Sequence, residues 1–165
     1  MQKRREQEFL KAYDDYADDL FRHAFFRVRD RERAKDLVQE TFTRTWTALS
    51  GGATIDNLRA FFYRVLTNAI IDESRKKKAA SLDTMLEEGF APRDEEATEA
   101  VLEVTIIRET HELLSTLPDE YRLPLIMRHL DGLSPREIAE VLGLTENLVS
   151  VRINRAINKL RKNTS

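Results

Sequence analysis

Apolar residues recur at three- and four-residue spacing through most of this chain, and this helical period constrains its fold more than any other feature. The clearest stripe runs through residues 58–70, at positions i, i+3, i+4, i+7, i+8, i+11 and i+12. Only five glycines and four prolines are present among 165 residues, few for the many tight turns of an all-β fold. The sequence therefore predicts an all-α protein made of amphipathic helices.

Capping residues and helix-breaking residues divide this pattern into separate helices. Asp30 is a suitable N-cap, the pair Gly51-Gly52 ends a helix, and Pro118 ends another. Pro124 lies inside a predicted helix, and we expect it near the first turn, where proline costs little. The expected helices span residues 6–28, 30–49, 56–78, 99–117 and 119–130, followed by two short helices within 134–160.

Charge is distributed unevenly along the chain and indicates a division into domains. Residues 1–78 carry a net charge of +4, residues 79–105 carry −7, and residues 106–165 carry +1. The acidic segment also has weak periodicity and contains Gly89 and Pro92. We therefore expect two small helical domains, 1–78 and 106–165, joined by an acidic flexible linker, 79–105. The linker either mimics nucleic acid in a basic channel or serves as a solubilising tether.

Several classes of function are disfavoured by what the sequence lacks. It contains no cysteine, and no apolar run approaches the roughly 18 residues of a membrane span. Its first residues lack the apolar stretch of a signal peptide. The histidines at 23, 111 and 129 do not follow a metal-binding spacing, and no phosphate-binding glycine loop occurs. We predict a cytoplasmic protein that is not an enzyme and uses no cofactor, metal or small-molecule substrate.

The segment from Ser134 to Leu160 has the pattern of a helix-turn-helix. Ser134 and Glu137 have the spacing of a capping box, and Gly143 suits the turn between two helices. Val149 and Ile153 would anchor the second helix on the first. Such a unit presents the exposed face of its second helix to the major groove of DNA.

The exposed face of this second helix carries side chains that suit DNA. Arginine reads guanine edges or phosphates, and asparagine reads adenine. The alternative is a helical hairpin that only packs and never binds DNA. We favour DNA binding, because the segment also ends in basic residues that suit phosphates. The candidate DNA-binding residues are Asn147, Ser150, Val151, Arg152, Asn154, Arg155 and Lys159.

A second informative stretch lies in the predicted helix 30–49. Val38, Phe42 and Trp46 form its apolar stripe. The opposite side presents a mixed polar face made of Asp36, Gln39, Glu40, Thr43 and Arg44. Taken alone, such a face is most simply a solvated surface.

The motifs together change this interpretation, because they resemble the extracytoplasmic-function (ECF) group of sigma factors. The stretch Asp36-Leu37-Val38-Gln39-Glu40-Thr41-Phe42, followed by Trp46, resembles the hallmark helix of that group. Residues 58–68, with Asp72 and Arg75, resemble its next helix. Leu117-Pro118 with Tyr121-Arg122 resembles the start of its second domain, and Glu137-Ile138-Ala139 with Leu142-Gly143 its helix-turn-helix. The resemblance covers residues 9–78 and 106–162.

The resemblance implies a sigma factor that binds core RNA polymerase and directs promoter recognition, DNA melting and transcription initiation. The polar face of helix 30–49 would dock on the clamp coiled coil of the largest polymerase subunit. The loop 50–56 and the following helix would melt and read the −10 element. Of three consecutive aromatics in that helix, we expect Phe61 and Phe62 in the core and Tyr63 at the surface. The −10 candidates are Arg59, Tyr63, Arg64, Asn68 and Arg75.

The second domain would read the −35 element as duplex, and there the chain departs from the pattern of the group. Leu148, Ser150, Val151 and Ile157 replace residues typical of the group, and two basic residues are lost. Either the affinity for duplex DNA is low or the −35 preference is unusual.

The resemblance also implies an anti-sigma partner, and two other readings stay open. One alternative is a stand-alone helix-turn-helix transcription regulator, which would need no polymerase and would usually bind a palindrome as a dimer. The other is an interaction protein that uses this fold only to trap a regulator.

Overall fold

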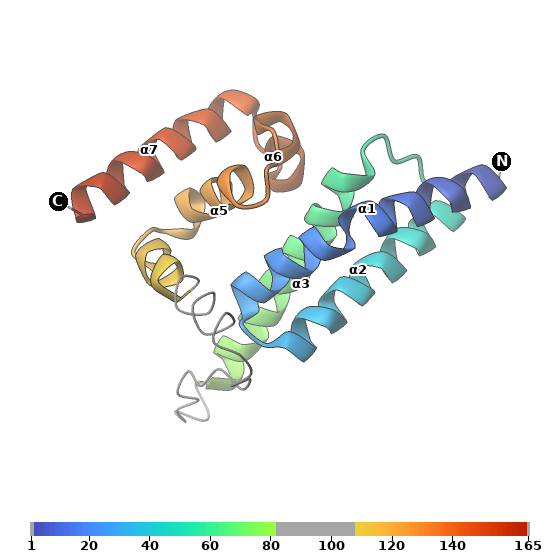
Figure 1. The fold of residues 1–165 in the computed structure, drawn as a ribbon, viewed down its shortest axis with the longest axis horizontal. Helices are drawn as coiled ribbons and strands as arrows, with labels where there is room; N and C mark the ends of the chain where they lie inside the picture. The colour runs from blue at the N-terminus through green and yellow to red at the C-terminus, as the bar shows by residue number, and fades with distance from the viewer. Residues whose placement is uncertain (1, 82–107, 165) are drawn as a thin grey trace. The chain divides into compact units, whose positions relative to one another are not determined.

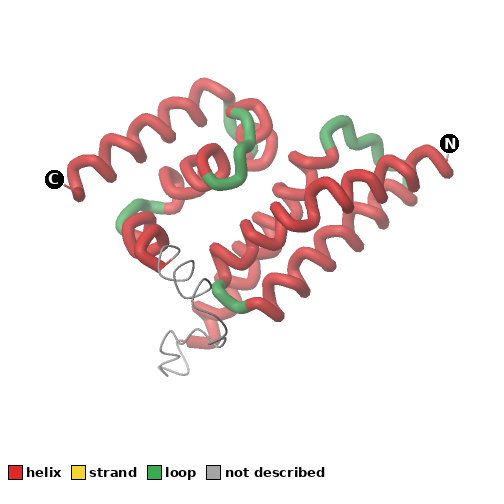
Figure 2. Tube along the Cα trace, viewed as in Figure 1, coloured by secondary structure: helices red, strands yellow, loops and turns green. Residues whose placement is uncertain are grey.

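The computed structural model describes residues 2–81 and 108–164, and every regular element in these ranges is a helix (Figures 1 and 2). The predicted all-α class is therefore confirmed. The chain divides into two compact units, Met1–Glu87 and Glu88–Ser165. Most of the predicted acidic linker, and the predicted helix before residue 108, lie outside the described residues.

The first unit consists of three helices, each of which packs against the other two (Figure 1). They are α1 (Gln2–Val28), α2 (Arg31–Ser50) and α3 (Leu58–Ser81). The chain passes from α1 to α2 through two residues only, Arg29 with a left-handed φ of 58° and Asp30. As predicted, Asp30 is the N-cap of α2: its side chain accepts a hydrogen bond from the Arg33 backbone N–H at 3.2 Å.

Aromatic rings hold these three helices together. The ring of Phe42 on α2 lies 4.5 Å from that of Tyr13 on α1 and 5.0 Å from that of Phe62 on α3, measured between centroids. Phe9 on α1 adds contacts to the same rings and lies 5.2 Å from Trp46. Tilted and edge-on pairs at these distances stabilise a core beyond the area that they bury. Phe42 thus connects all three helices at one point.

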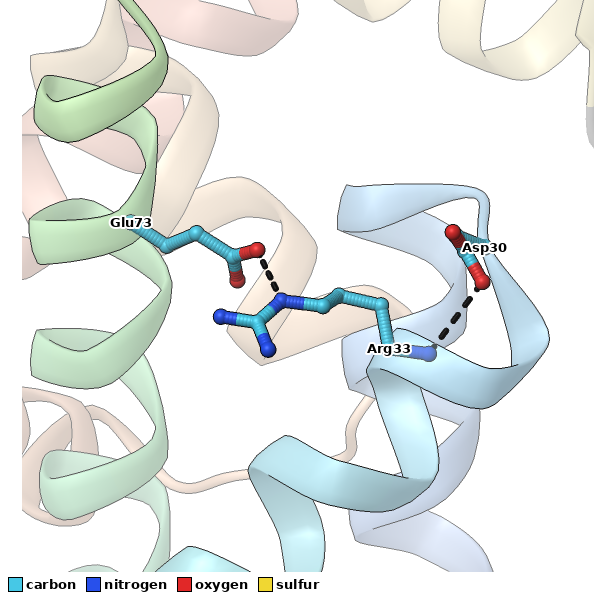
Figure 3. A network of polar contacts seen from close by, with 3 residues as sticks. All are labelled: Asp30, Arg33 and Glu73. Atoms are coloured by element: carbon cyan, nitrogen blue, oxygen red, sulfur yellow. Dashed lines mark hydrogen bonds and ion pairs between the residues drawn. The ribbon is translucent and has the colours of Figure 1, made fainter.

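One ion pair joins the start of α2 to the last turns of α3 (Figure 3). The Nε of Arg33 donates a hydrogen bond to the carboxylate of Glu73, whose side chain is 12% exposed. The hydrogen bond to Glu73 raises the pKa of Arg33. Because the Arg33 backbone is held by Asp30, the cap and the ion pair together align α2 with α3.

We expect Arg33→Ala to lower the free energy of unfolding of the first unit by about 1–2 kcal/mol, because a largely buried carboxylate loses a charged partner. The effect stays moderate because Arg33 is 43% exposed and solvent screens the pair. Urea denaturation followed by fluorescence measures it cleanly, since Trp46 is the only tryptophan of the chain.

Arg22→Ala is the matched control for this prediction. Arg22 pairs with Asp19 at 3.0 Å on the open surface of α1, so its loss should change stability by about 0.3 kcal/mol. Equal effects of the two substitutions would show that the Arg33–Glu73 pair contributes no more than a surface pair.

The second unit contains helical residues 108–115 followed by α5 (Asp119–His129), α6 (Pro135–Leu142) and α7 (Glu146–Thr164). α7 packs against both α5 and α6. Pro124 is the sixth residue of α5 and is buried, so the expectation that it lies near the first turn is wrong. α5 nevertheless continues through it.

Candidate nucleic-acid interface

The predicted polar face of α2 is exposed at each of its positions, namely Asp36, Gln39, Glu40, Thr43 and Arg44. Glu40 and Arg44 form an ion pair one turn apart at 2.6 Å. Thr43 donates its hydroxyl to the carbonyl of Gln39 at 2.9 Å. Because Phe42 and the other buried residues of α2 face the core, these five side chains form an exposed surface of hydrogen-bonding groups.

Along α3, three of the five predicted −10 residues form one exposed stripe. Arg64, Asn68 and Arg75 are exposed and stand at i, i+4 and i+11, which places them on one side of the helix. Arg59 lies elsewhere: it is half-buried, with its guanidinium carbon 5.9 Å from the ring centroid of Tyr16 on α1.

The prediction that Tyr63 is exposed is wrong. Tyr63 is 0% exposed, and its ring packs edge-on against that of the buried His23 at 5.4 Å. Phe62 is buried as expected, but Phe61 is only half-buried. Phe61 stands at i−3 from Arg64 and i−7 from Asn68, so it belongs to the exposed stripe of α3. Spacing from Arg64 and Asn68 was the only signal in the sequence for Phe61, and the apolar pattern of residues 58–70 outweighs it.

Arg59 lines an open pocket between α1 and the start of α3. The pocket has a volume of about 380 Å³ and contains Tyr16 and Asn57. Its rim carries acids as well as bases, among them Asp15 and Lys11. The pocket therefore offers an aromatic ring, an amide and both signs of charge.

The helix-turn-helix of the second unit has the predicted geometry. Ser134 and Glu137 form both hydrogen bonds of a capping box, each at 3.1 Å. Gly143 ends α6 with a left-handed φ of 68°. Thr145 caps α7 by accepting a hydrogen bond from the Leu148 N–H at 3.2 Å. Val149, at 0% exposure, anchors α7, so that its opposite side faces solvent.

The predicted −35 residues fall on two different sides of α7. Asn147, Ser150, Asn154 and Arg155 are exposed, and Val151 between them is half-buried. Arg152 and Lys159 are turned toward α5. The ammonium of Lys159 lies 5.2 Å from the ring centroid of Tyr121, and Arg152 lines a 160 Å³ pocket with Asp119 and Glu120.

One further cation stands beside this surface and was not predicted. Arg136 is exposed at the second position of α6, directly after Pro135. The first helix of a helix-turn-helix crosses the DNA backbone, so a base in its first turn suits a phosphate. The signal in the sequence was an arginine next to the capping box.

Two features, a membrane-spanning helix and a metal-binding cluster, are absent from the residues that the structure describes. Within 2–81 and 108–164, no helix has the length and apolar character needed to span a bilayer. In the same ranges, histidine, aspartate and glutamate side chains form no cluster suited to a metal ion.

Comparison with known families matches both units. Residues 12–80 match sigma-70 region 2, and residues 107–160 match sigma-70 region 4. These two regions cover the three-helix unit and the helix-turn-helix unit, and they define the chain as a sigma factor.

Comparison with individual relatives identifies the group of sigma factors to which the chain belongs. The chain is 31% identical to the ECF RNA polymerase sigma factor SigL of Mycobacterium tuberculosis, over 90% of this chain and 84% of SigL. It is 30% identical to the RNA polymerase sigma factor YlaC of Bacillus subtilis, over 92% of this chain and 88% of that protein. The B. subtilis ECF sigma factor SigW is 26% identical over 93% of this chain and 87% of its own. The chain therefore belongs to the ECF sigma factors, a family of non-enzymatic transcription initiation factors.

Solved structures show the same fold. The sigma factor RpoE of Bartonella quintana, solved with the anti-sigma factor NepR, superposes with a TM-score of 0.68 at 22% identity, covering 97% of this chain and 96% of that one. CnrH, solved with the cytosolic domain of CnrY, gives a TM-score of 0.70 at 24% identity, covering 96% of this chain and 88% of that one.

We expect Gly143→Ala to destabilise the second unit by about 1 kcal/mol, because a side chain at a left-handed φ crowds the backbone. Urea denaturation followed by circular dichroism measures this loss. Gly143→Asn is the control and should cost less, since asparagine tolerates this conformation better than alanine. A larger loss for asparagine than for alanine would contradict the explanation.

Proposed function

We propose that this chain binds core RNA polymerase through α2 and directs promoter recognition, DNA melting and initiation through α3 and α7. The observation that carries the proposal is the exposed polar face of α2, which has the group's characteristic sequence and is backed by a rigid aromatic core. Residues 1–78 would dock on polymerase and bind the −10 element, and residues 106–165 would bind the −35 element. Its place of action would be the cytoplasm, with the polymerase.

The polar face of α2 is suited to docking on the clamp coiled coil of the largest polymerase subunit. Asp36, Gln39, Glu40, Thr43 and Arg44 offer carboxylates, an amide, a hydroxyl and a guanidinium on one helix side. Such groups give orientation and specificity when they meet a complementary helix pair. The internal ion pair of Glu40 with Arg44 holds both side chains in place before binding.

The exposed stripe of α3 suits the melted −10 element. Single-stranded DNA binding combines cations that follow the backbone with aromatic side chains on which bases stack. Arg64 and Arg75 supply the cations, Asn68 supplies an amide for base edges, and Phe61 supplies the ring. Phe61 takes the role expected of Tyr63, because Tyr63 is buried. Arg59, at the pocket beside Tyr16, would meet DNA near the start of the helix.

The second unit suits duplex DNA at the −35 element. The outward side of α7 would enter the major groove, and Arg161 and Lys162 near its end would add phosphate contacts. An anti-sigma factor is a further proposed partner, because RpoE and CnrH, which share this fold, were solved in complexes with NepR and CnrY. No small-molecule substrate is proposed.

We expect the double substitution Gln39→Ala, Glu40→Ala to weaken binding to bacterial core polymerase at least about tenfold, because two central hydrogen-bonding side chains are lost. Fluorescence anisotropy of the labelled full chain with core polymerase measures the affinity. The matched control is Asp18→Ala, an exposed carboxylate on α1, which should leave the affinity unchanged.

The same assay separates this proposal from a stand-alone regulator. If the wild-type chain bound duplex DNA tightly but not core polymerase, the sigma reading would be contradicted in favour of the regulator. If Asp18→Ala weakened binding equally, the assignment of the docking surface to α2 would be contradicted. The proposal that the chain binds core polymerase would still stand.

We expect Phe61→Ala to slow open-complex formation about tenfold without changing core binding, because one base loses its stacking platform. Permanganate reactivity of thymines at the melted −10 element measures the opening. Leu58→Ala, a half-buried apolar residue one turn earlier, is the control for a loss of packing. An equal defect in that variant would show that Phe61 acts only through the fold.

A further inference from the structure

The first turns of α1 lie beside the end of α2, where the loop before α3 begins (Figure 1). The guanidinium of Arg5 donates a hydrogen bond to the backbone carbonyl of Leu49 at 3.3 Å. Leu49 lies in the last turn of α2, whose final carbonyls need partners from outside the helix. A cation is favourable there, because the helix dipole places partial negative charge at this end. Arg5 therefore stabilises the end of α2 from a different helix.

Aromatic packing sets the register that brings Arg5 to this carbonyl. α1 and α2 run in opposite directions, and the ring centroid of Phe9 on α1 lies 5.2 Å from that of Trp46 on α2. Arg5 stands about one turn before Phe9, and Leu49 stands about one turn after Trp46. The hydrogen bond between Arg5 and Leu49 thus continues the packing of the aromatic core by one more turn.

The carbonyl of Leu49 also belongs to the turn that starts the loop. It accepts a hydrogen bond from the Gly52 N–H at 3.1 Å, and the Ala53 N–H donates to the carbonyl of Ala48 at 3.0 Å. Gly52 has a left-handed φ of 95°, which lets the chain leave the helix direction at this residue. Arg5 and Gly52 therefore share one acceptor, and the guanidinium contacts the first turn of the loop as well as the end of α2.

The other end of the loop is fixed at the start of α3. Asn57 accepts a hydrogen bond from the Ala60 N–H at 3.0 Å, and it lines the pocket that contains Tyr16 of α1. Between the two ends, residues 51–54 and Asp56 are exposed. The loop is thus held at both ends, and it leads directly into the stripe of α3 that is proposed to bind melted DNA.

Arg5 lies outside the part of the chain that matches sigma-70 region 2, which begins at residue 12. We propose that Arg5 is a positioning residue for promoter opening. Through the carbonyl of Leu49 it fixes the loop 51–57 in the conformation that receives the melted −10 element, and it acts through the loop without contacting DNA. This inference rests on the proposed function and adds a residue that controls the loop before α3.

The first test measures amide hydrogen exchange of the full chain alone by NMR. Arg5→Met removes the cation and keeps an unbranched apolar side chain, so the amides of Gly52 and Ala53 should exchange about threefold faster. The amide of Ala60 should exchange at the wild-type rate, because its hydrogen bond to Asn57 does not involve Arg5.

Arg4→Met is the matched control for this substitution. Arg4 carries the same charge on the same turn of α1, but it pairs with Glu8 at 3.2 Å on the exposed surface. Its loss should leave exchange in the loop unchanged. Arg5→Lys keeps a cation that can donate to the Leu49 carbonyl, so it should restore part of the protection.

The second test uses holoenzyme assembled from the full chain and core polymerase, on a promoter that the wild-type holoenzyme selects from randomised duplex DNA. The time course of permanganate reactivity at thymines of the −10 element measures the opening rate. Arg5→Met should slow opening about threefold and leave the affinity for core polymerase unchanged. Arg5→Lys should recover part of the rate, and Arg4→Met should open the promoter at the wild-type rate.

Each remaining outcome has one meaning. Unchanged exchange of the loop amides in Arg5→Met would overturn the inference, and slower opening in that case would assign Arg5 to a direct phosphate contact. Faster exchange without slower opening would overturn its role in promoter opening, and an equal defect in Arg4→Met would reduce the effect to charge alone. Failure of the wild-type chain to bind core polymerase would contradict the proposed function itself, whereas the exchange of the free chain would still decide whether Arg5 fixes the loop.

Discussion

Packing of Phe42 between α1 and α3 is the constraint on which the first unit depends. Its ring contacts Tyr13 on one side and Phe62 on the other, so α2 is held along its inner surface by both neighbours. The polar face of α2 and the exposed stripe of α3 are the outer sides of helices whose inner sides meet at this ring. The proposed polymerase surface and the proposed DNA surface therefore share one aromatic support.

The second unit reaches a similar rigidity by a different route. It relies on backbone hydrogen bonding at helix ends: the capping box at Ser134, the left-handed Gly143 and the cap at Thr145 follow one another within twelve residues. These local devices set the angle at which α7 leaves α6. Val149 then fixes the rotation of α7 about its own axis. Which side chains face outward is thus decided by a short segment.

Much of this organisation could be predicted from the sequence, because it follows from local rules. Caps at Asp30 and Ser134 and the glycine turn are set by neighbouring residues, and the structure contains them as expected. The rotation of α3 could not be obtained in this way. Its apolar pattern admits Phe61 and Phe62 as inward residues, but in the structure Tyr63, which packs against the buried His23, is inward beside Phe62, and Phe61 is only half-buried. A polar core residue such as His23 cannot be recognised from the spacing of apolar residues along a helix.

The positions of Arg152 and Lys159 were beyond sequence reasoning for a related reason. Both lie on the flank of α7, and only the placement of α5 determines whether that flank is open or covered. Helical spacing gives directions around an axis, but it does not say which neighbouring helix fills each direction. The five residues of the α2 face were predictable because they lie on the side of α2 farthest from both neighbours.

The ion pair between Arg33 and Glu73 bears on how α3 would begin to unfold. Helices fray from their ends, and α3 ends at Ser81. Glu73 lies two turns before that end, and its partner stands in the first turn of α2. Fraying that starts at Ser81 therefore meets the Arg33–Glu73 contact before it reaches the ring of Phe62 in the aromatic core.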